Sequence, residues 1–194
     1  MVHFVLIRPA TTDYDQQERI QGNLDIPLND EGRAECSRLV EQLGGQRIET
    51  VYAPESQPAE GTAQLLGKGL KARFRRLDHL ENIDLGLWQG MLIGDVRHKQ
   101  PRVYRQWQEQ PETVCPPEGE MLSAADERVR QALARILKRH REGTVALVLP
   151  EPLLSLARRF LTHAELGDLW ESALPPAGFE AHLVDPELVF APSG

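Results

Sequence analysis

Two short loops hold the residues whose types and positions could do chemistry. Arg8-Pro9-Ala10 directly follows an apolar run at 2–7, and Pro150-Glu151-Pro152 directly follows a second run at 144–149. In an α/β sheet, ligands bind beyond the carboxyl ends of the strands, which is where both loops would lie. An arginine there can hold an anion through paired hydrogen bonds, although one guanidinium offsets little charge. Both loops are unusually rich in proline for a catalytic site.

The segments that must position these loops alternate between strand-like and helix-like patterns. Apolar runs predict strands at 2–7, 48–53, 73–77 and 144–149, with two short strands near Ala181 and Leu188. Apolar residues at helical spacing predict helices at about 30–44, 56–66, 96–108, 123–143 and 152–163, the third interrupted by Pro101. This alternation predicts an α/β three-layer sandwich, with a mostly parallel central sheet and helices on both faces. The length of 194 residues fits a single domain, 1–194.

Charge and composition limit the class of partner. Hydrophobic residues make up 41% and charged residues 26%, which is ordinary for a globular protein. The formal net charge of -7 argues against nucleic acid or an acidic membrane, because no strong positive field gathers phosphates. One local cluster of positive charge is an exception to the negative net charge, and it consists of Lys71, Arg73, Arg75 and Arg76. Alternation places the first three on one face of a strand, and we interpret them as a solvated sheet edge.

The sequence gives no sign of export or membrane insertion. The apolar start at 1–7 is too short for a signal peptide, and no stretch approaches the roughly 20 apolar residues of a membrane helix. Cys36 and Cys115 form neither a disulfide framework nor a metal site, so both are expected to be reduced thiols. We therefore expect a cytoplasmic protein without a metal or a cofactor. The sequence favours no particular oligomeric state.

Several further blocks of sequence follow one another along most of the chain. They are Arg19-Ile20-Gln21-Gly22 with Asp25, Pro27, Leu28, Gly32 and Ala34; Val51-Tyr52-Ala53 through Thr62-Ala63; Ile83-Asp84-Leu85-Gly86 with Trp88 and Gly90; Gly119-Glu120 with Arg128; and Val145 to Val148. In this order the blocks resemble segments of the histidine phosphatase superfamily, whose fold is phosphoglycerate-mutase-like. The family's first strand ends in Arg-His-Gly, and Arg8-Pro9-Ala10 stands in that place here.

The resemblance implies a two-step phosphoryl transfer. In this family a histidine after the first strand attacks phosphorus, and the phosphohistidine then passes its phosphoryl group to water or a second acceptor. Two arginines and a second histidine hold the phosphoryl oxygens, while an acidic residue protonates the leaving group. These cations offset the charge on the oxygens, so the chemistry needs no metal.

Carried over one position at a time, the resemblance implies a degenerate catalytic site. The nucleophile's position holds Pro9, whose amide nitrogen has no basic lone pair. The second arginine falls at Pro58, the general acid at Asn82 and the second histidine at Pro150. Glu81, next to Asn82, is an alternative for the acid. No residue at these positions is therefore expected to be catalytic.

What the resemblance leaves of the phosphate pocket is a vestigial anion site at Arg8, Gln21 and Gly22. Asp15 would add a negative charge to it. Asp13 and Asp15 also follow a strand, as in magnesium-dependent phosphatases with an aspartate nucleophile. Two residues at that spacing are common by chance, and the flanking blocks favour the histidine phosphatases.

The function predicted from these losses is that of a catalytically inactive pseudophosphatase with a binding or regulatory role. The missing nucleophile leads to this prediction, because the site and not the fold determines the function. Its ligand would be a protein partner or a small anionic metabolite. The alternative is a residual phosphatase or mutase that acts on a phosphomonoester.

Overall fold

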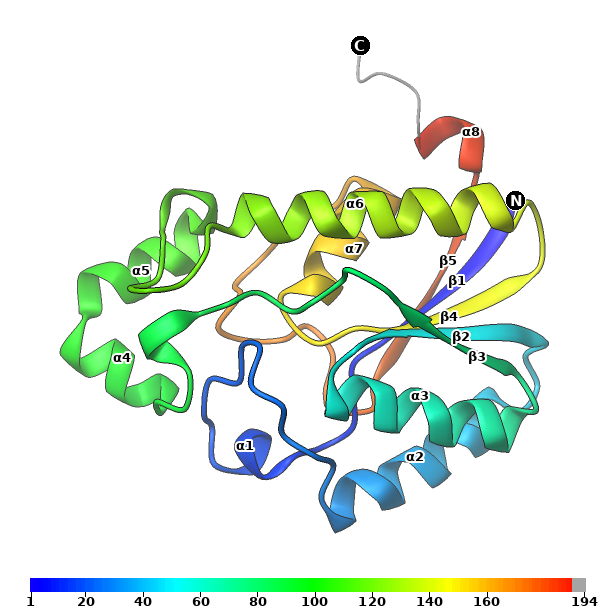
Figure 1. Cartoon of the computed structure of the whole chain (residues 1–194), viewed down its shortest axis with the longest axis horizontal. Helices are drawn as coiled ribbons and strands as arrows, with labels where there is room; N and C mark the ends of the chain where they lie inside the picture. Colours follow the sequence, from blue (N-terminus) through cyan, green and yellow to red (C-terminus); the bar gives the residue numbers. More distant parts are fainter. Residues whose placement is uncertain (190–194) are drawn as a thin grey trace.

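A five-stranded sheet forms the centre of the computed structural model, which describes residues 1–189 (Figure 1). The strand order is β3-β2-β4-β1-β5; the first four strands are parallel, and β5 pairs antiparallel with β1. The predicted α/β class with a mostly parallel sheet is therefore confirmed. The strands are β1 (Val2–Ile7), β2 (Ile48–Pro54), β3 (Arg73–Leu77), β4 (Thr144–Val148) and β5 (Phe179–Val184).

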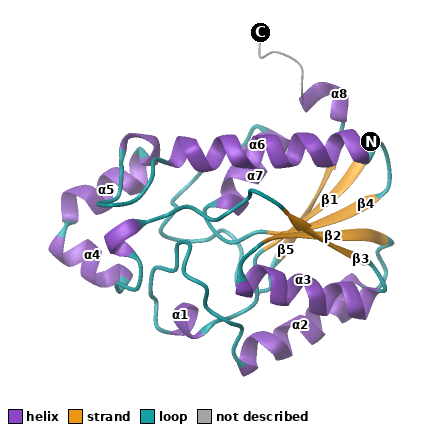
Figure 2. Ribbon diagram, viewed as in Figure 1, coloured by secondary structure: helices purple, strands orange, loops and turns teal. Residues whose placement is uncertain are grey.

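Helices cover both faces of this sheet (Figure 2). The helices of the described chain are α1 (Asp13–Gln16), α2 (Asp30–Leu43), α3 (Gln57–Leu70), α4 (Ile93–Lys99), α5 (Pro101–Glu109), α6 (Leu122–Arg139), α7 (Leu153–Thr162) and α8 (Pro186–Val189), with short 3-10 turns at Gly86–Trp88 and Pro111–Thr113. Of these, α2 and α3 pack on one face of the sheet and α6 and α7 on the other. Phe4 and Leu6 of β1 share one buried cluster with α6 and α7, whereas Val5 and Ile7 share the other with α2 and α3. Burial on both faces explains why β1 is apolar throughout. No helix within residues 1–189 is long and apolar enough to cross a membrane.

The register of β1 and β4 sets the position of the two loops that the sequence singles out. Leu6 lies beside Leu147 and Ile7 beside Val148, so the two parallel strands end at the same edge of the sheet. The Leu149 backbone N–H then donates to the Ile7 carbonyl at 3.0 Å, which continues the pairing by one residue. The loops that follow β1 and β4 must therefore be neighbours.

Helix α3 extends beyond its predicted end at residue 66. Its first turn accommodates Pro58, as expected for a position that needs no N–H donor. The helix continues to Leu70 and ends at Lys71, which adopts the left-handed conformation. A Cβ at Gly67 would lie 3.2 Å from the Ala72 carbonyl oxygen, so glycine lets the chain return closely into β3.

The predicted strand near Leu188 is wrong, because α8 occupies that segment. Pro186 has no N–H to give to a β ladder, which disfavours a strand there. The side chain of Asp185 accepts a hydrogen bond from the Glu187 backbone N–H at 3.0 Å, a local bond that favours a helical start. The strand expected near Ala181 is present as β5.

An aromatic cluster closes the carboxyl end of the sheet on the α6 side. The ring of Trp88 lies 5.6 Å from that of Trp107 and 5.4 Å from that of Trp170 between centroids. Tyr104 stacks on Trp170 at 4.8 Å, and the Trp170 indole N–H donates to the Tyr104 carbonyl at 2.8 Å. The cluster ties α5 and the segment after α7 to the rest of the core.

A bidentate ion pair joins α6 to the loop that precedes it. Arg128 donates from both terminal nitrogens to Glu120, at 2.8 Å and 2.6 Å, and the Asp84 backbone N–H donates to the same carboxylate at 3.0 Å. Burial alone would raise the pKa of Glu120, but the hydrogen bonds from Arg128 and Asp84 outweigh it and lower the pKa.

Acidification should remove the contribution of this pair to stability. The pKa of Glu120 is lower in the folded state than in the unfolded state, where it is about 4.3, so its contribution is present above that pH. It is lost as the pH falls through the lower folded value. Urea unfolding of wild type and Glu120→Gln between pH 7 and pH 3 should therefore show a shallower acid decline in the variant. Equal declines in both would contradict this account, and Glu109→Gln, on an exposed residue, is the matched control.

Candidate active site

A cavity of about 140 Å³ lies where β1 and β4 end. A water needs only about 10–15 Å³ of such space, so the cavity has room for a phosphoryl group with several waters. Segments far apart in the sequence meet around it. The residues singled out from the sequence that line it are Arg8, Pro9, Asp15, Gln21, Gly22, Pro58, Asn82 and Pro150.

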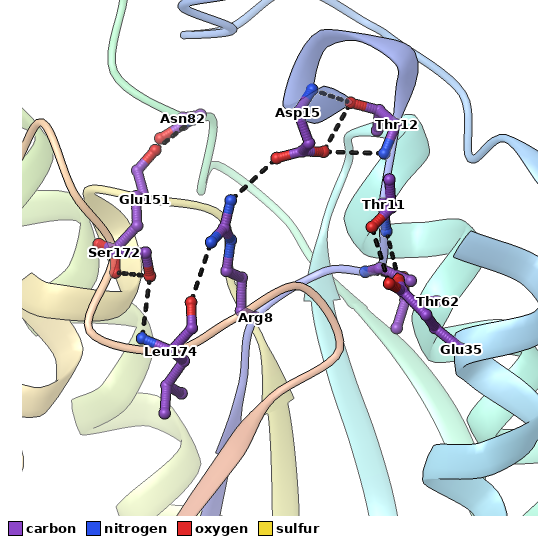
Figure 3. A network of polar contacts seen from close by, with 11 residues as sticks. Arg8, Thr11, Thr12, Asp15, Glu35, Thr62, Asn82, Glu151, Ser172 and Leu174 are labelled. Atoms are coloured by element: carbon purple, nitrogen blue, oxygen red, sulfur yellow. Dashed lines mark hydrogen bonds and ion pairs between the residues drawn. The ribbon is translucent and has the colours of Figure 1, made fainter. Parts of the chain in front are cut away.

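Two acceptors hold the guanidinium of Arg8 in this cavity (Figure 3). One terminal nitrogen donates to the Leu174 carbonyl at 2.9 Å, and the other donates to Asp15 at 2.9 Å. An arginine has five N–H donors, so three remain for a ligand. The side chain is 23% exposed, which leaves it partly accessible to solvent. Arg8 can therefore bind an anion without giving up either internal contact.

Asp15 is occupied by the local structure of α1. Its second carboxylate oxygen accepts from the Thr12 backbone N–H at 2.8 Å and from the Thr12 hydroxyl at 2.7 Å. With Arg8 on the first oxygen, Asp15 is a capping and orienting residue. Asp13 is exposed and accepts from the Asn29 side chain at 3.1 Å, and it does not line the cavity. This geometry does not support an aspartate nucleophile.

Asn82 connects two of the loops around the cavity. Its amide nitrogen donates to the Gly22 carbonyl at 2.8 Å and to the Glu151 carbonyl at 3.0 Å, and its oxygen accepts from the Ile83 backbone N–H at 2.9 Å. An amide with these contacts holds the loops in place but has no proton for a leaving group. Glu81 is exposed and is not among the lining residues.

The three prolines are buried, and the carbonyl group of each accepts a hydrogen bond. The Thr62 hydroxyl donates to the Pro58 carbonyl at 2.7 Å and accepts from the Ala10 backbone N–H at 3.0 Å. The Pro9 and Pro150 carbonyls accept backbone N–H groups of Ala177 and Leu154 at 3.2 Å and 3.1 Å. These contacts fix the loop geometry. Their description as degenerate catalytic positions stays a prediction, as does the vestigial anion site at Arg8, Gln21 and Gly22.

Glu151 lies in a loop that the sequence singles out, but no role was assigned to its carboxylate. One oxygen accepts from the Ser172 hydroxyl at 2.8 Å (Figure 3). The other accepts from the Ser155 backbone N–H at 3.2 Å. A carboxylate has about four acceptor sites, so about two remain on Glu151 for further hydrogen-bond donors. Its place directly after the most apolar strand was the available signal. The prolines on either side of it are not typical of a catalytic loop.

Arg19 is a second cation that sequence reasoning left without a role. It lines the cavity, and its side chain donates to the Gly90 carbonyl at 2.6 Å and to Gln17 at 2.8 Å. Gly22, nearby, has a φ of +55°, and a Cβ there would lie 2.1 Å from the Gln89 side-chain oxygen. The positive φ therefore favours glycine at this turn, which follows Arg19 and Gln21 along the chain.

The family model of the histidine phosphatase superfamily (branch 1) matches residues 4–186. The chain belongs to this superfamily. Phosphoserine phosphatase 1 of Hydrogenobacter thermophilus is 30% identical over 148 residues, which cover 76% of this chain and 70% of that protein. Glucosyl-3-phosphoglycerate phosphatase of Mycobacterium tuberculosis is 29% identical over 133 residues, which cover 69% of this chain and 59% of that protein. The chain thus spans between 59% and 70% of the length of these two relatives.

The superfamily fold is also evident from a solved structure. A mycobacterial glucosyl-3-phosphoglycerate phosphatase in complex with VO3 superposes with a TM-score of 0.82 at 23% identity. The match covers 92% of this chain and 90% of that one. This confirms the phosphoglycerate-mutase-like version of the three-layer sandwich.

These relatives contradict the prediction of an inactive pseudophosphatase, because both are named as phosphatases. The prediction that the chain is no enzyme is therefore wrong. It treated the loss of the family's covalent nucleophile as the loss of the reaction. Water can also attack phosphorus directly, and that route needs positioning and charge but no histidine. The alternative, action on a phosphomonoester, agrees better with the comparisons.

Proposed function

We propose that this chain is a phosphatase that hydrolyses a small phosphomonoester in the cavity at the ends of β1 and β4. One observation carries the proposal. Arg8, whose guanidinium is held by Asp15 and Leu174, and Glu151 both line one small cavity. A cation for the phosphoryl oxygens and a base for water therefore lie in the same place. The names of the relatives support a phosphorylated metabolite as the class of substrate.

In this proposal, Arg8 and Arg19 hold the phosphoryl oxygens and offset their charge. Six donors remain after the internal hydrogen bonds of the two side chains, three on each. They stabilise the charge that spreads over the oxygens during transfer. The apolar lining at Leu85, Ile93 and Leu169 would face the remainder of the substrate.

Glu151 is the proposed general base. It takes a proton from a water molecule, whose oxygen forms a bond to phosphorus as the bond from phosphorus to the ester oxygen breaks. The leaving alkoxide then takes a proton from solvent water. No covalent enzyme intermediate forms, because the amide nitrogen of Pro9 cannot accept a phosphoryl group.

Replacing Glu151 with glutamine should lower kcat about 100-fold, since a positioned base typically contributes 10²–10⁴. The amide is isosteric and keeps an oxygen for Ser172, so KM should change little. The measurement is inorganic phosphate release from O-phosphoserine, 3-phosphoglycerate and para-nitrophenyl phosphate. The control is Glu109→Gln, which makes the same change on an exposed residue. Equal kcat for wild type and Glu151→Gln would exclude Glu151 as the base.

A cytoplasmic location stays a prediction. So does a protein partner. A small anionic metabolite, expected from the sequence as a ligand, becomes the substrate in this proposal.

A further inference from the structure

A second cavity, of about 540 Å³, lies on the α6 face of the sheet at its β3 edge. Tyr52 of β2, Leu77 of β3 and Ile136 of α6 give it a buried, largely apolar floor. It shares no lining residue with the candidate active site. Its volume falls in the range of about 300–1,000 Å³ that is typical of small-molecule sites.

Four arginines line this cavity from two elements, Arg75 and Arg76 from β3 and Arg135 and Arg139 from α6. Arg75 lies directly across from Tyr52 in the β2–β3 pairing, so its side chain is on the same face of the sheet as Tyr52. Arg135 and Arg139 are four residues apart on α6 and therefore share one face of that helix. Arg135 donates to the Asp78 carbonyl at 3.4 Å, which draws it toward the end of β3.

Three of these arginines, Arg75, Arg135 and Arg139, form no ion pair within residues 1–189. Asp78 is the only acidic residue of that range that lines the cavity. Arg76 differs, because it pairs with Glu55 and Glu60 at 3.3 Å and 2.8 Å. Like charges four residues apart on a helix repel one another. An anion in the cavity would relieve this repulsion.

His140 lies beside the cavity, and nearby charges of both signs act on its imidazole. Its Nε2 lies 2.8 Å from the Tyr52 hydroxyl, at the edge of the cavity floor. Its pKa is lowered, chiefly by burial and further by the charges of Arg139 and Arg75, while Glu49 acts in the opposite direction. Two of the cavity's arginines are therefore close enough to each other to act on one imidazole.

We propose that this cavity binds a nucleotide-sized organic phosphate that carries at least two phosphoryl groups. Three guanidinium groups match the charge of a diphosphate, and the apolar floor suits a ring. A solvated sheet edge, as the sequence suggests, explains exposed Arg73 but not a cavity that β3 shares with α6. The net charge of -7 opposes a long polyanion, so a small molecule fits better than nucleic acid.

The test is isothermal titration calorimetry of the whole chain with ADP at low salt. Wild type should bind ADP, and adenosine, which has no phosphate, should bind at least about tenfold more weakly. The double variant Arg135→Ala/Arg139→Ala should also bind ADP at least about tenfold more weakly. Raising the salt from about 0.1 M to about 1 M should weaken binding, because the Debye length falls from about 10 Å to about 3 Å. Thermal melting of each variant shows whether it is folded.

Two further variants separate this cavity from other sites. Arg105→Ala removes one charge from an exposed helical residue outside the cavity and should leave ADP affinity unchanged. Arg8→Ala should also leave it unchanged, because Arg8 lines only the candidate active site. Loss of ADP binding in Arg8→Ala but not in the double variant would overturn the proposal. No binding of ADP by wild type, or a single-stranded oligonucleotide that binds more tightly than ADP, would overturn it as well.

Discussion

Replacing Arg8 with alanine is expected to lower kcat/KM for phosphomonoester hydrolysis by about 100- to 1,000-fold. This is the usual loss when one preorganised donor to a developing anion is removed. The change also leaves Asp15 with only its Thr12 contacts and adds an unpaired negative charge beside the substrate. Both effects oppose the binding of a phosphoryl group. The measurement is the initial rate of phosphate release as a function of substrate concentration.

Arg8→Lys separates charge from geometry in the same experiment. Lysine keeps the positive charge but cannot form a planar, bidentate contact, so its kcat/KM should lie between those of wild type and Arg8→Ala. Arg105→Ala, outside both cavities, should keep wild-type activity. Full activity in Arg8→Ala would mean that phosphoryl binding occurs elsewhere.

Replacing Trp88 with alanine should lower the free energy of unfolding by about 3–5 kcal/mol, the range for large aromatic deletions in a core. Trp88 is 1% exposed and contacts both Trp107 and Trp170, so the cavity left behind cannot collapse easily. Leu87, the preceding residue, is 59% exposed, and Leu87→Ala should change the same quantity by only about 0.5 kcal/mol. Urea unfolding followed by circular dichroism measures both. A loss below about 1 kcal/mol for Trp88→Ala would show that the cluster contributes little.

Much of the fold could be predicted because its central elements carry strong local patterns. β1 and β4 are apolar on both faces, and the Asn29 cap at the start of α2 accepts from the Gly32 backbone N–H at 3.0 Å. The tail could not be predicted in the same way. There Pro186 and one Asp185 hydrogen bond decide between a strand and a helix. Such a choice depends on a single contact rather than on a repeated pattern.

The site was predictable in position but not in chemistry. Motif order placed Pro9, Pro58, Asn82 and Pro150 around one point, and all four line one cavity. The contacts that the charged side chains of the site make with one another and with the backbone cannot be predicted from motif order. The hydrogen bond from Arg8 to the Leu174 carbonyl joins residues 166 positions apart, so no local sequence pattern predicts it. The functional error followed from judging the site by the family's lost residues instead of by the charged groups still present.

The most direct test of the proposed function follows phosphate release and protein labelling together. Purified wild-type protein is incubated with a ³²P-labelled phosphomonoester such as O-phosphoserine, quenched, and separated into free phosphate and protein. For wild type we expect phosphate release well above a buffer blank, and for Arg8→Ala we expect most of this release to be lost. The protein should carry no acid-labile, base-stable label, because Pro9 cannot carry a phosphoryl group. No phosphate release above the blank from any phosphomonoester tested would contradict the account.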